Sequence, residues 1–105
     1  MKNPLNHVAI LFLAASIAVP AIAQSAADTY TSKCKMCHGA TGLGDTPAAK
    51  ALKVPSFKDP GIVKASDTDL IAAVTNGKGK MPPNKGKLTD VQIKALIAYV
   101  RTLQK

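Results

Sequence analysis

The chain has 105 residues, two cysteines and two histidines, and it carries a formal charge of +8 at pH 7. This length is enough for one small domain. The positive charge is compatible with nucleic acid, an anionic membrane or an acidic protein face as partner, and it does not choose between them.

The first 23 residues have the layout of a secretory signal peptide. Lys2 gives a basic start, residues 8–19 are an uncharged apolar run, and an Ala-x-Ala cleavage site ends at Ala23. The run is shorter than the ~20 residues that span a bilayer, so cleavage is favoured over an uncleaved anchor. The expected division is a leader at 1–23 and a domain at 24–105, exported to the periplasm or an equivalent compartment. Export argues against nucleic acid as a partner, and cleavage argues against stable membrane insertion.

The motif at 34–38, Cys-Lys-Met-Cys-His, is the attachment pattern of c-type haem. A capping-box sequence at Ser25 predicts a helix that begins there and continues into the motif. On a helix, Cys34 and Cys37 lie about one turn apart and face one side, so both thiols can form thioethers with one porphyrin. His38 is then placed to bind the iron as its proximal ligand.

Other interpretations of the two cysteines have less support from the sequence. A zinc site needs about four ligands, and the second histidine, His7, lies in the leader. A dithiol redox motif of thioredoxin type needs a βαβ pattern, which the sequence lacks. A structural disulfide would leave His38 without a role. The sequence therefore predicts one covalently bound haem c as the cofactor.

The segment after the motif is expected to be mostly loop. Glycines within 39–44 predict a loop that passes close to the haem. Thr46, as an N-cap followed by proline, predicts a short helix that ends near Leu52. Residues 59–61, Asp-Pro-Gly, predict a turn. Leu52 and Phe57 are candidates for the wall of the haem pocket.

Two longer helices follow. Capping boxes at 66–69 and 89–92 predict helices that end at Asn76 and near Leu103. The last helix has one apolar face, formed by Ile93, Leu96, Ile97, Val100 and Leu103. Residues 77–87, rich in glycine and with two prolines, predict an irregular loop between these helices. No segment has a strand pattern, so an all-α fold is expected.

Met81, in this irregular loop, is the expected distal iron ligand. Haem with histidine on one side commonly takes methionine or histidine on the other. The leader contains Met1 and the second histidine, and Met36 is tied between the two thioether cysteines. Lys78 or Lys80 would compete for the iron only when deprotonated, mainly at high pH.

These motifs resemble those of the small monohaem class I cytochromes c, including the cytochromes c6. The resemblance rests on the motif at 34–38 with its glycine-rich loop, on residues 76–82 and on the terminal helix at 93–103, and it covers the chain after the leader. It implies a compact class I cytochrome c fold of about four helices around one haem. It also implies that the first and last helices cross, with Tyr30 and Tyr99 near the crossing. Members of the family carry single electrons between larger redox complexes.

The expected function is therefore electron transfer by a monomer, with no catalytic residues and with both axial positions of the iron filled. The alternatives are a haem-based gas sensor, which needs an open iron, and a cytochrome subunit of a dehydrogenase complex. A peroxidase is a less supported alternative, because the chain has one haem motif and no other histidine after the leader. We expect the partners to be acidic faces of a reductase, oxidase or dehydrogenase. Six lysines flank the haem-contacting segments and would steer such partners, unless they only solubilise the surface: Lys33, Lys35, Lys78, Lys80, Lys85 and Lys87.

Overall fold

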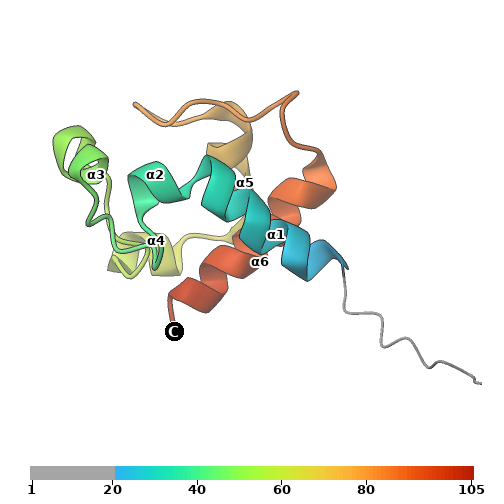
Figure 1. Ribbon diagram of the computed structural model, residues 1–105, viewed down its shortest axis with the longest axis horizontal. Helices are drawn as coiled ribbons and strands as arrows, with labels where there is room; N and C mark the ends of the chain where they lie inside the picture. The colour runs from blue at the N-terminus through green and yellow to red at the C-terminus, as the bar shows by residue number, and fades with distance from the viewer. Residues whose placement is uncertain (1–20) are drawn as a thin grey trace, which may run out of the picture.

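The computed structural model describes residues 21–105, which form six α-helices joined by loops (Figure 1). No strand occurs in this part of the chain, where the only β pairings are isolated bridges in the loop before the last helix. The all-α prediction is confirmed. The helices are α1 (Ala21–Lys33), α2 (Lys35–His38), α3 (Pro47–Leu52), α4 (Pro60–Lys64), α5 (Asp67–Asn76) and α6 (Asp90–Leu103).

The leader expected at residues 1–23 lies outside the described residues, except for its end, which forms the first turn of α1. The predicted start of this helix at Ser25 is wrong, because α1 begins at Ala21 and its backbone continues through Ser25. The residues from Ala21 to Ser25 include no glycine or proline that would end a helix. Within residues 21–105, none of the helices has both the length and the apolar character that crossing a membrane requires.

The first and last helices cross, as the family resemblance implies, and the crossing forms the centre of the core (Figure 1). Tyr30 of α1 is 1% exposed, and its ring lies 5.3 Å from that of Tyr99 on α6. The predicted apolar face of α6 is confirmed, because Ile93, Leu96, Ile97 and Val100 are all buried. At helical spacing these side chains form one stripe toward α1 and α5, while Val91 stays exposed.

Three helices that follow the haem motif, α3, α5 and α6, begin at the capping residues that the sequence predicts. The Thr46 hydroxyl accepts a hydrogen bond from Ala49 N–H, and Thr89 and Gln92 form a complete capping box. Ser66 caps α5 through the N–H of Asp69. The turn predicted at 59–61 is wrong, because these residues open α4: the Asp59 carboxylate accepts from Gly61 N–H, and proline occupies the first helical position.

One arginine ties the α4–α5 junction to the last helix. The Arg101 guanidinium donates to the carbonyl oxygens of Ile62 (3.4 Å), Val63 (3.2 Å) and Ala65 (2.6 Å). Its Nε also donates to Asp67 Oδ1 at 3.0 Å. These carbonyls lie at the end of α4, where a helix leaves its last carbonyls without intrahelical partners, although that of Ile62 also accepts from Ala65 N–H at 3.2 Å. A planar group with five donors can satisfy them together, whereas an ammonium group cannot.

We therefore expect Arg101→Lys to lower the free energy of unfolding by about 1–3 kcal/mol, because several carbonyls lose their donor while the charge is kept. The measurement is urea unfolding followed by circular dichroism. Lys94→Gln, on the same helix and exposed, is the control and should change stability by less than about 0.5 kcal/mol. Equal midpoints for Arg101→Lys and the unmodified protein would contradict this role.

Candidate haem site

The cysteine motif lies where the first helix breaks and restarts. The carbonyl oxygen of Cys34 accepts hydrogen bonds from Cys37 N–H (3.2 Å) and His38 N–H (2.9 Å). The two cysteines are therefore one helical turn apart, as the spacing predicts. Both are half-buried free thiols, and Cys34 also packs against the hydrophobic core.

Burial sets the charge state of the motif. It raises the pKa of Cys34 to about 11, with a smaller contribution from the Cys37 thiol. Burial also lowers the pKa of His38, because the charged imidazolium is poorly solvated there. His38 is thus neutral at physiological pH, and a neutral imidazole has the free nitrogen lone pair that a metal requires.

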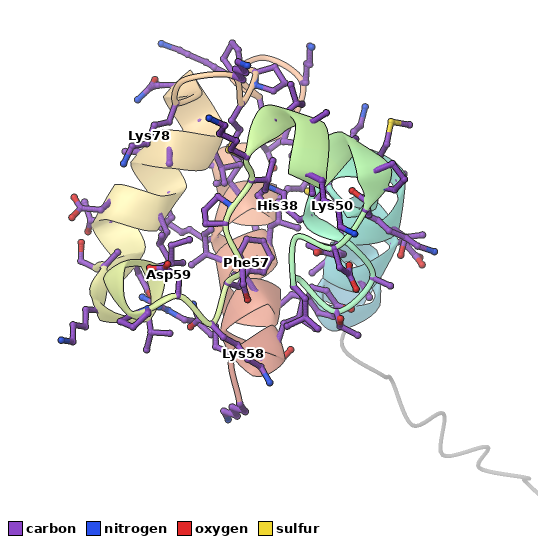
Figure 2. The ribbon with its side chains drawn as sticks, turned by 90° about the vertical axis from the view of Figure 1, so that its left-hand side faces the viewer. His38, Lys50, Phe57, Lys58, Asp59 and Lys78 are labelled. Atoms are coloured by element: carbon purple, nitrogen blue, oxygen red, sulfur yellow. The ribbon has the colours of Figure 1, made fainter. Side chains whose placement is uncertain are left out.

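His38 lies against Phe57, with ring centroids 4.7 Å apart and planes inclined by 25° (Figure 2). Its Nδ1 atom is buried and has no hydrogen-bond partner within the described residues. A buried polar atom without a partner indicates that something is missing from its surroundings. The unpartnered Nδ1 is compatible with a ring that meets a bound group, although it lacks the carbonyl or carboxylate that usually orients an iron-binding imidazole.

A buried tyrosine holds the backbone that follows His38. The Tyr30 hydroxyl donates to the carbonyl oxygen of Gly39 at 2.6 Å. Burial raises the pKa of Tyr30 to about 12, with smaller contributions from Cys34, Tyr99 and Asp45, so the hydroxyl keeps its proton. The resemblance implied only that Tyr30 is near the helix crossing. The signal that points to this bond is general: a fully buried tyrosine needs a hydrogen-bond partner.

The glycine-rich loop brings Phe57 to His38. Gly42 has φ +74°, and its carbonyl oxygen accepts a hydrogen bond from Phe57 N–H at 2.8 Å. A Cβ at Gly42 would collide with the Phe57 ring, so the loop passes directly over that ring. Phe57 therefore lies beside the motif, as expected for a residue of the pocket wall. Leu52, the other candidate for the wall, is 39% exposed.

Met81 is held in a short turn between α5 and α6. Its N–H donates to the Lys78 carbonyl (2.9 Å), and its own carbonyl accepts from Lys78 N–H (3.1 Å). Three residues later, both the backbone N–H and the side-chain amide of Asn84 donate to the Val74 carbonyl, at 3.0 and 3.1 Å. These bonds fasten the loop to the end of α5. The side chain of Met81 is half-buried and packs against the core.

The structure brings Cys34, Met81 and, through Phe57, His38 to one core cluster. Cys34 and Met81 both pack against it, Cys37 belongs to the same turn as Cys34, and His38 stacks on Phe57, a member of the cluster. The described residues contain no group of three histidine, cysteine, aspartate or glutamate side chains that could hold a metal without haem. Two thiols, a neutral imidazole and a thioether are the donors that haem c uses, so these residues fit it.

The six lysines that flank the two segments are all exposed. Figure 2 shows two more lysines on the side of the molecule where His38 lies, Lys50 of α3 and Lys58 after Phe57. Neither lysine is predictable as part of this side from the sequence, because both are distant in sequence from the motif and from Met81. Only the fold places them on this side.

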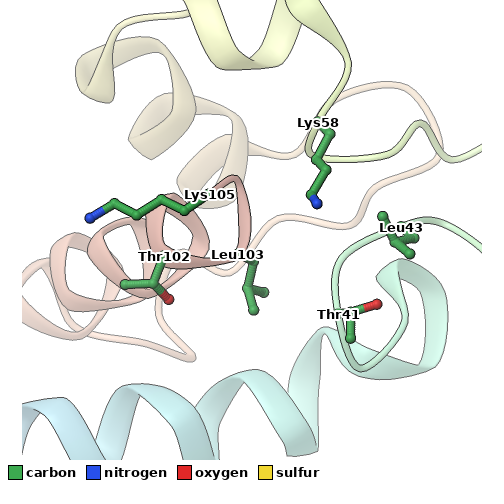
Figure 3. A pocket seen from close by; sticks show the side chains of 6 residues that line it. All are labelled: Thr41, Leu43, Lys58, Thr102, Leu103 and Lys105. Carbon is green, nitrogen blue, oxygen red and sulfur yellow. The ribbon is translucent and has the colours of Figure 1, made fainter.

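An open groove of about 370 Å³ lies beside the glycine-rich loop, at the end of α6 (Figure 3). It is lined by Thr41, Leu43, Lys58, Thr102, Leu103 and Lys105. None of the four candidate haem residues lines it.

Comparison with known proteins finds similarity to cytochromes and to a cytochrome oxidase subunit. The family model described as cytochrome c oxidase, cbb3-type, subunit III, matches residues 21–100. Cytochrome c6 from Leptolyngbya boryana is 41% identical over 71 residues, covering 68% of this chain and 80% of that protein. Cytochrome c6 from a Nostoc species is 37% identical over 89 residues, covering 85% and 78%.

Two further similarities concern an oxidase subunit and a solved structure. The FixP subunit of the cbb3-type cytochrome c oxidase of Azorhizobium caulinodans is 32% identical over 104 residues, which cover 98% of this chain but 34% of FixP. The solved c-type cytochrome KustC0563 superposes with a TM-score of 0.70 at 34% identity, covering 76% of this chain and 98% of that one. This chain therefore belongs to the cytochrome c family, as a small class I member that binds haem c covalently and transfers electrons with redox proteins.

Proposed function

We propose that the protein is a one-electron carrier whose single haem c is attached through Cys34 and Cys37, with its iron held between His38 and Met81. The observation that carries the proposal is the packing of both segments on one core cluster, although they are far apart in the sequence. A ligand pair held by one rigid core changes little when the iron changes its charge. Small rearrangement is what an electron carrier requires.

Each residue has a distinct part in this function. When bound, haem c supplies an iron that cycles between ferric and ferrous states. His38 is kept neutral by burial and offers a nitrogen lone pair. Met81 offers a thioether, which favours the ferrous state and so raises the reduction potential. With both axial positions filled by the chain, no site remains for a substrate, and we propose no catalytic residue.

A second role is favoured by two of the comparisons. The family model describes an oxidase subunit, and FixP matches almost the whole of this chain with about a third of its own length. The chain could therefore act as the cytochrome subunit of a larger redox complex rather than as a free carrier. Co-purification of a tagged chain with stoichiometric partner proteins would favour the subunit. A monomer in size-exclusion chromatography with light scattering would favour the free carrier.

We further propose that residues 1–23 are a signal peptide and that the protein acts in the periplasm. The basic start, short apolar run and Ala-x-Ala site of the sequence support this. We expect the intact mass of the haem-containing protein from a periplasmic extract to correspond to a chain beginning at Gln24. A mass that includes the leader, in protein recovered only from membranes, would contradict cleavage.

The iron ligands are tested by visible spectroscopy. We expect sharp bands in the reduced protein, a weak far-red band from the sulfur–ferric iron bond, and no change on adding carbon monoxide. Met81→Ala should remove the far-red band and let the reduced protein bind carbon monoxide, because one axial position is then open. Met36→Ala is the control and should retain both properties. A carbon monoxide complex of the unmodified protein would instead support a gas sensor.

The loop before Met81 gives a second test of ligation. Gly77 has φ +77°, and a Cβ there would lie 2.6 Å from the Met81 carbonyl oxygen and 2.9 Å from Pro83 N. We expect Gly77→Ala to displace the loop, at a cost of about 1–3 kcal/mol, and to weaken the far-red band.

Gly86→Ala is a matched control for this test. Gly86 has a similar φ of +80° in the same loop, but a Cβ there would contact nothing within 4 Å. Gly86→Ala therefore imposes the same backbone strain as Gly77→Ala but without a collision. Equal loss of the far-red band in both variants would show that the contact of Gly77 with the Met81 backbone does not hold the ligand.

The exposed lysines support partners with acidic faces. We expect Lys78→Glu combined with Lys80→Glu to slow electron transfer to an acidic redox partner by about tenfold at low ionic strength, with a smaller effect at high salt. Stopped-flow kinetics measures the rate. Lys94→Glu, on α6 and away from the candidate ligands in sequence, is the control. Rates that do not depend on salt would contradict electrostatic steering.

A further inference from the structure

Met36, inside the haem-attachment motif, is unusually accessible. Its side chain is 80% exposed, more than any other large apolar side chain in the described part of the chain. Successive residues of a helix are rotated by about 100°, so Met36 points roughly opposite to Cys34 and His38 and well away from Cys37. A haem bound to those three residues would lie on the other side of the turn. The Met36 sulfur thus stays open to solvent in the haem-containing protein.

Met81, the other methionine of the described residues, is in a contrasting environment. Its side chain is half-buried against the core, and its backbone is held by two hydrogen bonds to Lys78. Under the function proposed above, its sulfur also gives a lone pair to iron. Oxidation of a thioether needs an available lone pair and access for the oxidant. Iron would take one lone pair of Met81 and make the other less nucleophilic, and partial burial limits access, so Met36 meets both conditions better.

We propose that Met36 is a site of sulfoxidation by hydroperoxides and that it reacts in preference to Met81. The Met36 sulfur attacks the terminal oxygen of the hydroperoxide, and the O–O bond breaks. The sulfur is oxidised to the sulfoxide, while the hydroperoxide is reduced to water or to an alcohol. The product is a polar group between Lys35 and Cys37, which methionine sulfoxide reductases can convert back to the thioether. The preference for Met36 rests on the proposed ligation of Met81.

The experiment exposes the ferric haem-containing protein to hydrogen peroxide and follows both methionines by mass spectrometry. Trypsin cleaves after Lys35 and Lys80, so each methionine begins a separate peptide. We expect the Met36 peptide to gain one oxygen while the Met81 peptide gains none and the far-red band persists. Oxygen on Met81 before Met36, or on neither residue, would overturn the proposal.

Met36→Leu keeps the size of the side chain and removes its sulfur. This variant should keep the visible spectrum and take up no oxygen under the same conditions. Uptake equal to that of the unmodified protein would place the oxidation elsewhere and overturn the proposal. If the far-red band is absent before any peroxide is added, the proposed ligation of Met81 is contradicted. The mass of the Met36 peptide still shows whether Met36 is oxidised.

Discussion

The burial of Tyr30 at the crossing of α1 and α6 is the constraint on which the rest of the structure depends. Its ring packs against Tyr99 on one side and lies edge-on to Phe57 on another, with centroids 6.3 Å apart. Its hydroxyl then reaches the Gly39 carbonyl, directly after the histidine of the motif. One side chain thus joins the crossing of two helices to the backbone of the haem site. A buried hydroxyl without this acceptor would destabilise the core.

The loop that carries Met81, the candidate distal ligand, is held to the same core by other contacts. The Met81 loop is fastened to the end of α5 by Asn84, and α5 packs on α6 beside the crossing. Arg101 and Gln104 at the end of α6 hold the segment between Phe57 and α5, through carbonyl oxygens of that segment. Both candidate iron ligands are therefore linked indirectly to the last helix, His38 through Phe57 and Met81 through α5. In so small a domain, a second independent core is not available.

Local signals in the sequence predicted local structure well. The capping residues Thr46, Ser66 and Thr89 start helices as expected, because a cap needs only its own first turn. The apolar face of α6 and the irregular loop around Met81 were also predictable from spacing and from glycine and proline. The haem cofactor followed from the motif at 34–38, and the family comparison confirms it.

Features that depend on distant contacts were not predictable. The sequence predicts a turn where α4 forms, because Asp-Pro-Gly favours both and the carbonyls that end α4 are bound by Arg101 from across the fold. Lys53 adopts φ +56° at the end of α3, although nothing in its side chain favours that conformation. The bond from Tyr30 to Gly39 and the positions of Lys50 and Lys58 likewise require the tertiary fold.

The central claim is that the core positions Met81, and no other methionine, as the distal ligand of the haem iron. The most direct measurement is an NMR spectrum of the reduced protein, with carbon-13 in the methionine methyl groups. When a methionine sulfur binds the iron, the methyl group on that sulfur lies over the porphyrin ring, and its proton signal moves far upfield. The account predicts one strongly upfield methyl signal that disappears in Met81→Leu, while the Met36 signal stays at its ordinary position. No upfield signal, or one that survives this substitution, would contradict it.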